Sequence, residues 1–347
     1  MTWDGFLKRI VLGLALTSCL IYLFIVLMNP YGNLPLHVFG PHVIMDTNQR
    51  FQYPAIVRSG DFDSFVLGTS TARLLDPAEL EQVFGGHFAN LAMNDGRAWE
   101  QTQLAKLFFR TVPHIKTVLI GLDGVWCDPH ADTARTTQRG FPTWIFDDNP
   151  VNGWFYLFNY TTLEISVRKL IYHLGLAKRR WPSNGFDVFV PPESSYDLSR
   201  AEDHIWGSGP HTIVAATPVY TPSSDDRAKW AFPALGWLAD LMDKSDKSTR
   251  FVLVFMPVHV AAQPQPGSNF AAREAECKQR VTQIAERRGL GVVDMRIASP
   301  ITNEDSNYWD SLHYRLPVGQ RIVADVKRAL DTRTDDPRGE WEFRSGT

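Results

Sequence analysis

The sequence predicts an α/β domain built on a parallel sheet and preceded by one transmembrane helix. Residues 10–28 (IVLGLALTSCLIYLFIVLM) contain no charge and no proline, and short apolar segments further along alternate with segments of helical periodicity. Such alternation is typical of a parallel sheet covered by helices on both faces. With 347 residues, of which 44% are apolar, the chain is long enough to bury a large core.

The apolar segment 10–28 is the first predicted element. At about 1.5 Å of rise per residue, it would cross the roughly 30 Å hydrocarbon core of a bilayer. Lys8 and Arg9 precede it, and no further lysine or arginine follows before Arg50. The positive-inside rule therefore predicts a single-pass protein of the inner membrane, with residues 1–9 in the cytoplasm and the remainder on the extracytoplasmic side.

A cleaved signal peptide and a lipoprotein signal are the alternatives for this segment. The apolar run continues to Met28 instead of ending at a small-residue cleavage site, which favours an uncleaved signal anchor. The stretch from Leu16 to Cys19 also resembles a lipoprotein processing box. Lipidation of Cys19 would likewise keep the protein on the membrane.

The alternating pattern begins after residues 29–60, a Gly/Pro/Asn-containing stretch that we interpret as a juxtamembrane connection. Buried strands are expected from their short apolar runs at 65–67, 87–92, 117–122, 250–256 and 291–295. Helices are expected from their caps and periodicity at 77–84, 99–109, 269–287 and after Pro317.

Residues 125–248 interrupt this pattern within a predicted domain at 61–331. The segment contains many of the tryptophans, an apparent helix at 152–174 and Pro/Ser-rich punctuation. We interpret it as an insertion that forms a substrate-facing lid, although its aromatic residues could equally form the core of a small subdomain. Residues 332–347 are expected to be a polar C-terminal tail.

Composition limits the partners and cofactors. The formal net charge of -3 argues against nucleic-acid binding. No cysteine lies near another, so a paired zinc site is not expected, and we expect Cys127 and Cys277 to be unpaired, although they could bridge in an oxidising compartment. The acid and histidine cluster Asp123, Asp128, His130 and Asp132 lacks regular ligand spacing, so no metal or other cofactor is predicted.

Ser70 is the first candidate catalytic residue. It directly follows a predicted buried strand, at the edge where a parallel sheet opens its ligand crevice. A hydroxyl there can face substrate while the following turn supplies backbone N–H groups to a developing oxyanion. The alternative is that Gly68-Thr69-Ser70 is simply a turn that ends the strand.

Asp310 and His313 form the second candidate pair, just before the last predicted helix. Three residues apart on a loop, the carboxylate can accept the Nδ1 proton and leave Nε2 to accept a proton from serine. His259, after another predicted strand, could contribute to substrate binding, but a packed or surface histidine is the favoured interpretation.

Four blocks in order along the chain resemble the SGNH/GDSL hydrolases. They are Gly68-Thr69-Ser70, Gly96 within NLAMNDGRAWEQ, Gly121-Leu122-Asp123, and Asp310-x-x-His313. The resemblance covers about 61–123 and 250–330. It implies a flavodoxin-like three-layer α/β/α sandwich.

The resemblance also implies roles for these residues. Ser70 would be the nucleophile, His313 the general base and Asp310 its orienting partner, with the backbone N–H groups of Ser70 and Gly96 as oxyanion donors. Asp123 departs from the family, because an asparagine side chain donates to the oxyanion at this position and an ionised carboxylate only accepts. Asp123 would have to be protonated or turned away, or another donor such as Asn94 would have to replace it.

A membrane anchor combined with such a domain resembles bacterial envelope proteins that transfer or remove O-acetyl groups on polysaccharides, including those of alginate acetylation. The expected function is therefore an extracytoplasmic serine esterase or O-acyltransferase acting on an envelope glycan, within a possible glycan-synthesis complex. The alternatives are a non-catalytic carbohydrate-binding or assembly protein that retains the fold, and a lipid or thioester hydrolase.

Overall fold

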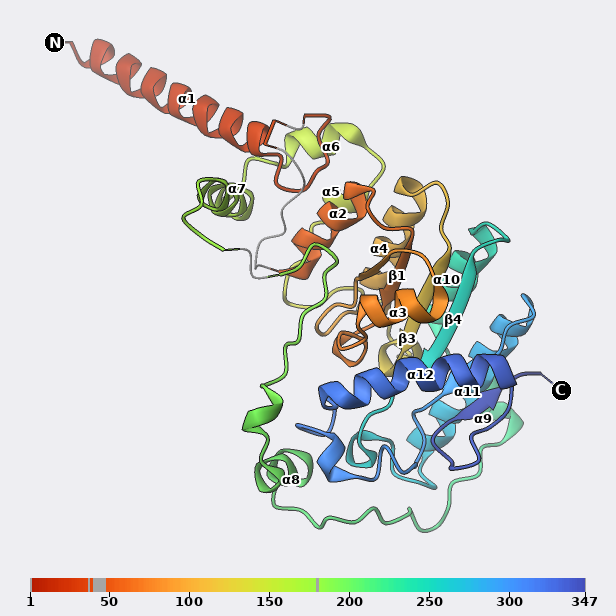
Figure 1. Ribbon diagram of the computed structural model, residues 1–347. Coiled ribbons are helices and arrows are strands. Elements are labelled where there is room, and N and C mark those ends of the chain that lie inside the picture. The colour runs from red at the N-terminus through yellow and green to blue at the C-terminus, as the bar shows by residue number, and fades with distance from the viewer. Residues whose placement is uncertain (1, 37, 40–47, 179–180, 347) are drawn as a thin grey trace. The chain divides into compact units, whose positions relative to one another are not determined.

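The computed structural model describes residues 2–36, 38–39, 48–178 and 181–346. The chain divides into two compact units (Figure 1). Unit 1 comprises residues 1–61 and 141–183, and unit 2 comprises residues 62–140 and 184–347. The predicted insertion at 125–248 is therefore wrong as a single element, because its middle part belongs with the N-terminal residues and its remainder belongs with the sheet.

Unit 2 contains a six-stranded sheet in the order β2-β1-β3-β4-β5-β6. The first five strands are parallel and confirm the five predicted segments; β6 is antiparallel to β5. The bounds are β1 Ser64–Leu67, β2 Phe88–Asn90, β3 Thr117–Leu122, β4 Arg250–Phe255, β5 Val292–Asp294 and β6 Glu342–Arg344. β1, β2, β3 and β5 are buried throughout, as expected for strands covered on both faces.

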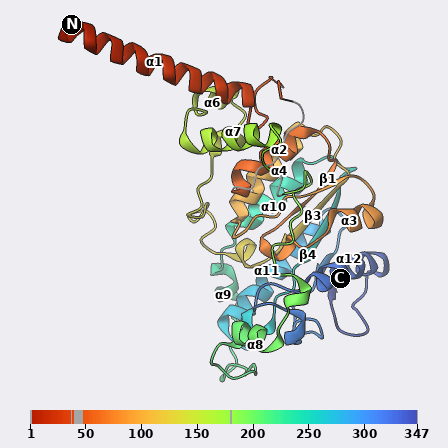
Figure 2. The same ribbon diagram turned by 60° about the vertical axis from the view of Figure 1, so that its left-hand side comes forward.

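Two groups of helices pack in unit 2. α3 packs on α12, while α4 and α11 both pack on α10 (Figures 1 and 2). The bounds are α3 Pro77–Phe84, α4 Ala98–Thr111, α8 Leu198–Trp206, α9 Ser224–Lys229, α10 Pro233–Lys244, α11 Asn269–Glu286 and α12 Leu316–Thr332. The core beside α3 and α12 includes Leu80, Ile322 and Val326, packed with the strand residues Val66 and Val252. Alternate strand residues thus bury their apolar side chains against a helical stripe.

Single-turn helices follow several strands on the side where β1 and β3 end. η1 Ser70–Ala72 follows β1 and η2 Gly124–Cys127 follows β3. η4 Val260–Ala262 follows β4 after a short connection, while η3 Glu193–Ser195 and η5 Asp305–Asn307 lie in longer loops.

Unit 1 is helical over its described residues. Its helices are α1 Trp3–Met28, α2 Gln49–Ser59, α5 Thr143–Phe146, α6 Pro150–Phe155 and α7 Tyr160–His173. The predicted juxtamembrane connection at 29–60 therefore contains a helix, α2; residues 37 and 40–47 of that connection lie outside the described residues.

α1 begins earlier than the predicted segment 10–28, because Thr2 caps it by accepting a hydrogen bond from the backbone N–H of Gly5. It ends where Asn29 adopts a left-handed conformation, with φ of 40°. Among the described residues, it is the one helix that is long and apolar enough to cross a membrane.

The C-terminal residues correct another prediction. Residues 332–347 were expected to form a polar tail, but β6 extends the sheet and Trp341 is buried. Arg344 Nε donates to Asp294 Oδ2 at 2.7 Å, and Lys278 Nζ donates to Asp294 Oδ1 at 3.1 Å. A buried carboxylate with two cationic partners is well compensated, so this network fixes the edge strand on the domain.

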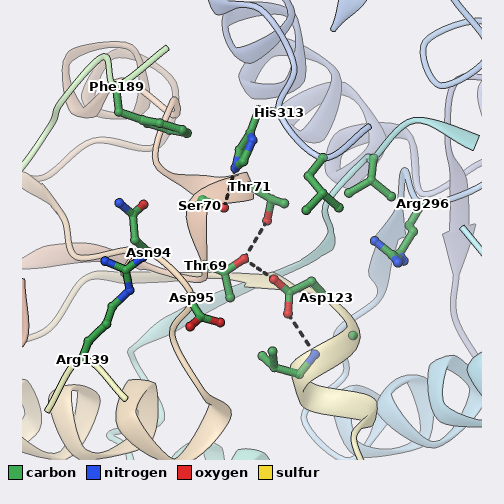
Figure 3. A pocket seen from close by; sticks show the side chains of 14 residues that line it. Thr69, Ser70, Thr71, Asn94, Asp95, Asp123, Arg139, Phe189, Arg296 and His313 are labelled. Atoms are coloured by element: carbon green, nitrogen blue, oxygen red, sulfur yellow. Dashed lines mark hydrogen bonds between the residues drawn. The ribbon is translucent and has the colours of Figure 1, made fainter. Parts of the chain in front are cut away.

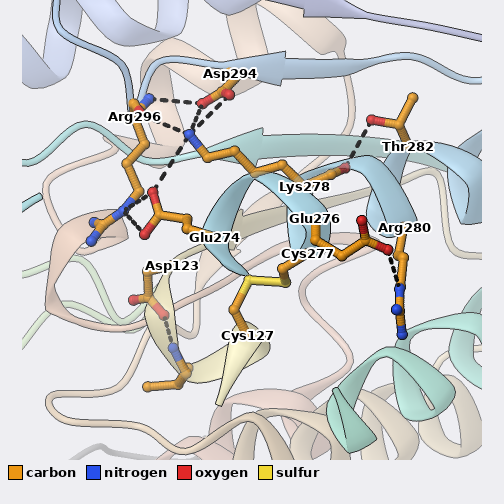
Figure 4. Close-up of a disulfide and its surroundings, with 11 residues drawn as sticks. Asp123, Cys127, Glu274, Glu276, Cys277, Lys278, Arg280, Thr282, Asp294 and Arg296 are labelled. Atoms are coloured by element: carbon orange, nitrogen blue, oxygen red, sulfur yellow. Dashed lines mark hydrogen bonds and ion pairs between the residues drawn. A yellow bond between two sulfur atoms is a disulfide. The ribbon is translucent and has the colours of Figure 1, made fainter. Parts of the chain in front are cut away.

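Cys127 and Cys277 form a disulfide, contrary to the expectation that they are unpaired (Figure 4). Cys127 ends η2 after β3, and Cys277 lies on α11, 150 residues later. Their Cα atoms are 5.7 Å apart, within the range for a disulfide. Spacing in the sequence does not reveal this pair, because the tertiary fold alone creates the proximity.

Candidate active site

Ser70 begins η1, directly after the loop that follows β1. Two glycines allow this turn to approach the sheet closely. A Cβ added to Gly68 would lie 2.6 Å from Ala72 Cβ, and one added to Gly121 of β3 would lie 2.8 Å from the same atom. The buried Asn90 amide fixes the turn from the other side, because its Nδ2 donates to the carbonyls of Ala72, Arg73 and Leu75.

The structure brings the three predicted catalytic side chains together, and Figure 3 shows Ser70 next to His313. His313 Nε2 lies 2.9 Å from Ser70 Oγ, across 243 residues of sequence, and His313 Nδ1 lies 2.8 Å from Asp310 Oδ2. With Nδ1–H donating to the carboxylate, Nε2 is the acceptor for the serine proton. This is the geometry of a serine nucleophile, its base and an orienting acid.

The loop of Asp310 and His313 is built by local hydrogen bonds. Asp310 Oδ1 accepts from the backbone N–H groups of Leu312 at 2.8 Å and His313 at 2.9 Å. Partial burial alone would raise the pKa of Asp310, but its hydrogen bonds with the His313 side chain and these backbone groups hold the pKa below the ordinary value. The carboxylate is thus kept ionised, as an orienting acid must be.

Ser70 and His313 open onto a cavity of about 580 Å³. Most of its lining residues are polar or charged. They are Thr69, Ser70, Thr71, Asn94, Asp95, Asp123, Gly124, Val125, Arg139, Phe189, Val258, Arg296, Leu312 and His313. All belong to unit 2.

Phe189 is the aromatic residue that the predicted insertion contributes to the cavity; none of the described lining residues is a tryptophan. Its ring meets the His313 ring edge to face, with centroids 5.2 Å apart. The Arg73 guanidinium lies 4.5 Å from the centroid of the Phe189 ring and donates to Asp187 Oδ2 at 2.6 Å. This buried arginine therefore holds the 187–189 segment over the base.

Asp123 is turned toward the nucleophile loop (Figure 3). Thr69 Oγ1 donates to Asp123 Oδ2, and the backbone N–H of Val125 donates to Oδ1 at 3.2 Å. Burial raises the pKa of Asp123, and the Thr69 hydrogen bond and the Arg296 charge offset part of that increase. Both carboxyl oxygens of Asp123 already have hydrogen-bond partners. The carboxyl therefore positions Thr69, the residue next to Ser70, and does not simply substitute for an asparagine side chain.

Gly96 does not have the orientation that the resemblance implied. Its backbone N–H donates to the carbonyl of Met93 at 3.0 Å, and Gly96 is not among the residues that line the cavity. The cause is a tight turn in which Asp95 adopts a φ of 51°. The turn instead places Asn94 and Asp95 at the cavity, with Asn94 Oδ1 accepting from Arg73 Nη1 at 2.8 Å.

Several residues at the cavity were missed by sequence reasoning. Arg296, after β5, has its Nε bound to Glu274 at 3.2 Å and lines the cavity together with Arg139. Arg296 could have been predicted as a site residue, because it is a charged residue that directly follows the predicted strand at 291–295. Phe189 and Arg139 lie in irregular segments, and no local pattern marks them.

His259 is a packed histidine, as favoured. It is fully buried, its Nδ1 accepts from the backbone N–H of Ala261 at 3.2 Å, and its Nε2 lies 2.9 Å from Asp305 Oδ1. Burial lowers the pKa of His259, although the neighbouring Asp305 opposes this effect. His259 does not line the cavity.

One group of described side chains has potential metal ligands close together. The ligand atoms of Glu202, His211 and Asp305 lie within 4.8 Å of one another. Asp305 already accepts hydrogen bonds from Trp206 Nε1 at 3.0 and 3.1 Å. The Asp305 side chain thus has a structural role in joining α8 to η5.

No protein-family model, curated protein or solved structure matches the chain. Functional reasoning therefore starts from the geometry of Ser70, His313 and the cavity beside them.

Proposed function

We propose that this protein is a serine esterase or O-acyltransferase of the SGNH/GDSL type that acts on ester-linked acyl groups of an envelope polysaccharide. The observation that supports this most is the arrangement of Ser70, His313 and Asp310 at one edge of a polar cavity. Successive hydrogen bonds link Ser70 to His313 and His313 to Asp310, and the Ser70 hydroxyl faces the cavity. This arrangement satisfies the geometric requirements for nucleophilic acyl chemistry.

In the proposed reaction, Ser70 Oγ attacks the ester carbonyl while His313 Nε2 takes the hydroxyl proton. The tetrahedral intermediate collapses to an acyl-serine, and the protonated imidazole returns the proton to the departing sugar oxygen. Water or a second sugar hydroxyl then attacks the acyl-serine, with His313 again acting as base. Hydrolysis and transfer differ only in this second nucleophile.

The oxyanion would be stabilised by the Ser70 backbone N–H and the Asn94 amide. Arg73 Nη1 binds Asn94 Oδ1, which assigns the amide oxygen to the arginine and makes the NH₂ group the donor. Asn94 would thereby replace the donors that Gly96 and Asp123 do not supply in this structure. The loss of one oxyanion donor typically costs about 2.7–4 kcal/mol of transition-state stabilisation.

The lining of the cavity supports a polar substrate. Hydroxyl, amide, carboxylate and guanidinium side chains line the cavity around Ser70, together with the apolar side chains of Val125, Phe189, Val258 and Leu312. A lipid or thioester hydrolase would instead need a deep apolar channel for the acyl chain. An ester of a short acyl group on a sugar fits this lining better.

Fold and location fit the same proposal. The parallel strand order β2-β1-β3-β4-β5 is the order of flavodoxin-like folds, with Ser70 at a position where the order changes direction. Lys8 and Arg9, which precede the apolar segment 10–28 of α1, support an anchor with unit 2 on the extracytoplasmic side of the inner membrane. The disulfide between Cys127 and Cys277 also favours an oxidising compartment.

The test is covalent labelling and turnover by the full-length protein in detergent. A fluorophosphonate probe should label wild type at Ser70, and an aryl acetate should be hydrolysed. Ser70→Ala should lose the label and reduce turnover at least about 10⁴-fold, as is typical when a serine nucleophile is removed. Ser208→Ala, an exposed serine of unit 2, is the matched control and should behave as wild type.

A wild-type protein that is neither labelled nor active on the aryl acetate, and from which Ser70→Ala does not differ, would contradict the proposal. In that event the orientation of Gly96 and the substitution at Asp123 would favour the second candidate, a carbohydrate-binding or assembly protein that uses the same cavity. Titration with O-acetylated polysaccharide would then give binding without release of acetate.

A further inference from the structure

Unit 1 exposes a dense group of large apolar side chains near α6 and α7. Between residues 151 and 176 the described chain exposes ten of them, whereas the much longer unit 2 exposes seven among its described residues. This apolar patch consists of Val151, Trp154, Phe155, Tyr156, Phe158, Tyr160, Val167, Ile171, Leu174 and Leu176. Phe155, Tyr160 and Leu176 are 79%, 81% and 76% exposed.

Part of the patch is a stripe along α7 and the turn after it. Tyr160, Val167, Ile171 and Leu174 are spaced by seven, four and three residues, which places them on one face of a helix. The opposite face, including Ile165 and Lys169, is buried within the protein. α7 therefore has one face satisfied by its own fold and one apolar face without a protein partner among the described residues.

The helices that carry the patch lie beside α1 (Figures 1 and 2). α7 packs on α1, and Lys169 Nζ donates to the carbonyls of Met28 and Asn29 at 2.9 and 3.2 Å. Tyr22 Oη donates to the carbonyl of Trp154 at 2.9 Å, and the Tyr22 and Phe158 ring centroids are 6.4 Å apart. These contacts are all internal to unit 1.

The contacts with α1 also define how deeply the patch would lie in a membrane that α1 crosses. Tyr22 lies six residues before Met28, or about 9 Å along a helix at about 1.5 Å per residue. Helices that lie in a membrane interface bury their apolar face about 5–10 Å into it. Trp and Tyr are the side chains enriched at that depth, and Trp154, Tyr156 and Tyr160 are among the patch residues.

We propose that the apolar patch of unit 1 is a membrane-interface surface that inserts into the outer leaflet beside α1. α1 carries the patch to the bilayer, and lipid covers the side chains that the protein leaves exposed. The protein would then contact the membrane through a spanning helix and an adjacent interfacial helix pair, which restrains unit 1 more than a single flexible anchor does. This inference rests on the proposed membrane anchor and is independent of the proposed chemistry.

The experiment measures depth in the full-length protein. Single cysteines are introduced in a Cys19→Ala background, in which the two remaining native cysteines are disulfide-bonded. Phe155→Cys tests the patch, Leu12→Cys tests α1, and Val219→Cys is the exposed apolar control in unit 2. Each variant carries an environment-sensitive fluorophore in nanodiscs of phosphatidylethanolamine and phosphatidylglycerol, whose two faces are both open to solution.

Lipids with a nitroxide on the acyl chain near the headgroup should quench the Phe155 label at least about twofold, because an interfacial residue reaches the upper acyl chains. Aqueous iodide should quench the Val219 label strongly and the Phe155 label weakly. Equal behaviour of the Phe155 and Val219 labels would overturn the inference. A Phe155 label shielded from both quenchers would also overturn it, by indicating that protein covers the patch.

The Leu12 label separates this inference from the anchor itself. Lipid quenching at Leu12 without quenching at Phe155 would leave the anchor and reject the interfacial surface; no lipid quenching at Leu12 would reject both. A second variant adds Phe155→Ser and Tyr160→Ser to a label at Leu176→Cys. It should lower lipid quenching at Leu176, whereas Phe270→Ser in unit 2 should leave that quenching unchanged.

Discussion

Unit 1 and unit 2 use apolar residues in opposite ways. Unit 2 hides its apolar side chains between a sheet and two groups of helices, and the residues that line the cavity beside Ser70 include nine polar or charged ones. Unit 1 has no strand among its described residues, and it exposes several aromatic side chains along α6 and α7. This difference is what the proposed membrane-interface surface requires, because water favours the first kind of surface and a lipid interface favours the second.

The same contrast appears in how each unit treats a buried charge. In unit 2, Asp294 is fully buried between Lys278 and Arg344, so opposite charges compensate one another. In unit 1, the buried Lys169 has carbonyl groups at the end of α1 as its hydrogen-bond partners among the described residues, and burial lowers its pKa to about 8. Carbonyls at a helix C-terminus carry partial negative charge, which makes this position tolerable for a cation.

The largest expected effect is on catalysis and is confined to unit 2. Asp310→Asn should reduce aryl acetate turnover about 10⁴-fold, because the amide favours the wrong tautomer of His313. Phe155→Ser, in unit 1, should leave turnover in detergent unchanged. Steady-state kinetics of both variants measure the contrast, and a similar loss in the two would argue against a catalytic site contained in unit 2.

The next effect is on the stability of unit 2. Replacing Cys127 and Cys277 by serine should lower its free energy of unfolding by about 2–5 kcal/mol, because the disulfide closes a long loop. Hydrogen exchange should show faster opening of β3 and α11, while α1 and α7 keep their protection. Unchanged exchange in β3 would mean that the bridge contributes little to this unit.

The smallest effect is the pH dependence that Asp123 produces. Burial raises its folded-state pKa above the ordinary 3.8, so the folded protein retains a proton that the unfolded chain has lost. Stability should therefore fall as pH rises from 3.8 through the folded-state pKa, and Asp123→Asn should remove that decrease. Urea unfolding midpoints of both proteins across this range provide the measurement; parallel profiles would rule out the effect.

The fold was largely predictable because buried parallel strands have a strong local pattern. All five predicted strands occur, and the strand ends that carry Ser70 and Asp123 lie at one edge of the sheet. Asp310 and His313 are only three residues apart, so their pairing depended on a short loop. Their approach to Ser70, across 243 residues, was expected from the order of the blocks.

Other features had no local signal. β6 is a three-residue strand in a charged tail, and its pairing with β5 depends on Asp294, which lies far away in the sequence. The orientation of Gly96 depends on the φ of Asp95. The assignment of residues 141–183 to unit 1 depends on packing with α1 and α2, which no periodicity within that segment indicates.

The sequence by itself determined the apolar N-terminal helix and the parallel strands, because hydrophobic periodicity encodes them. The three candidate catalytic residues were marked by the order of the blocks that resemble SGNH/GDSL hydrolases. The tertiary structure alone decided the disulfide, the Arg73 and Phe189 contacts around His313, the position of Asp123 against Thr69, and the apolar patch beside α1. These features depend on which distant segments meet. That outcome is set by the packing of the whole chain, and no local pattern carries it.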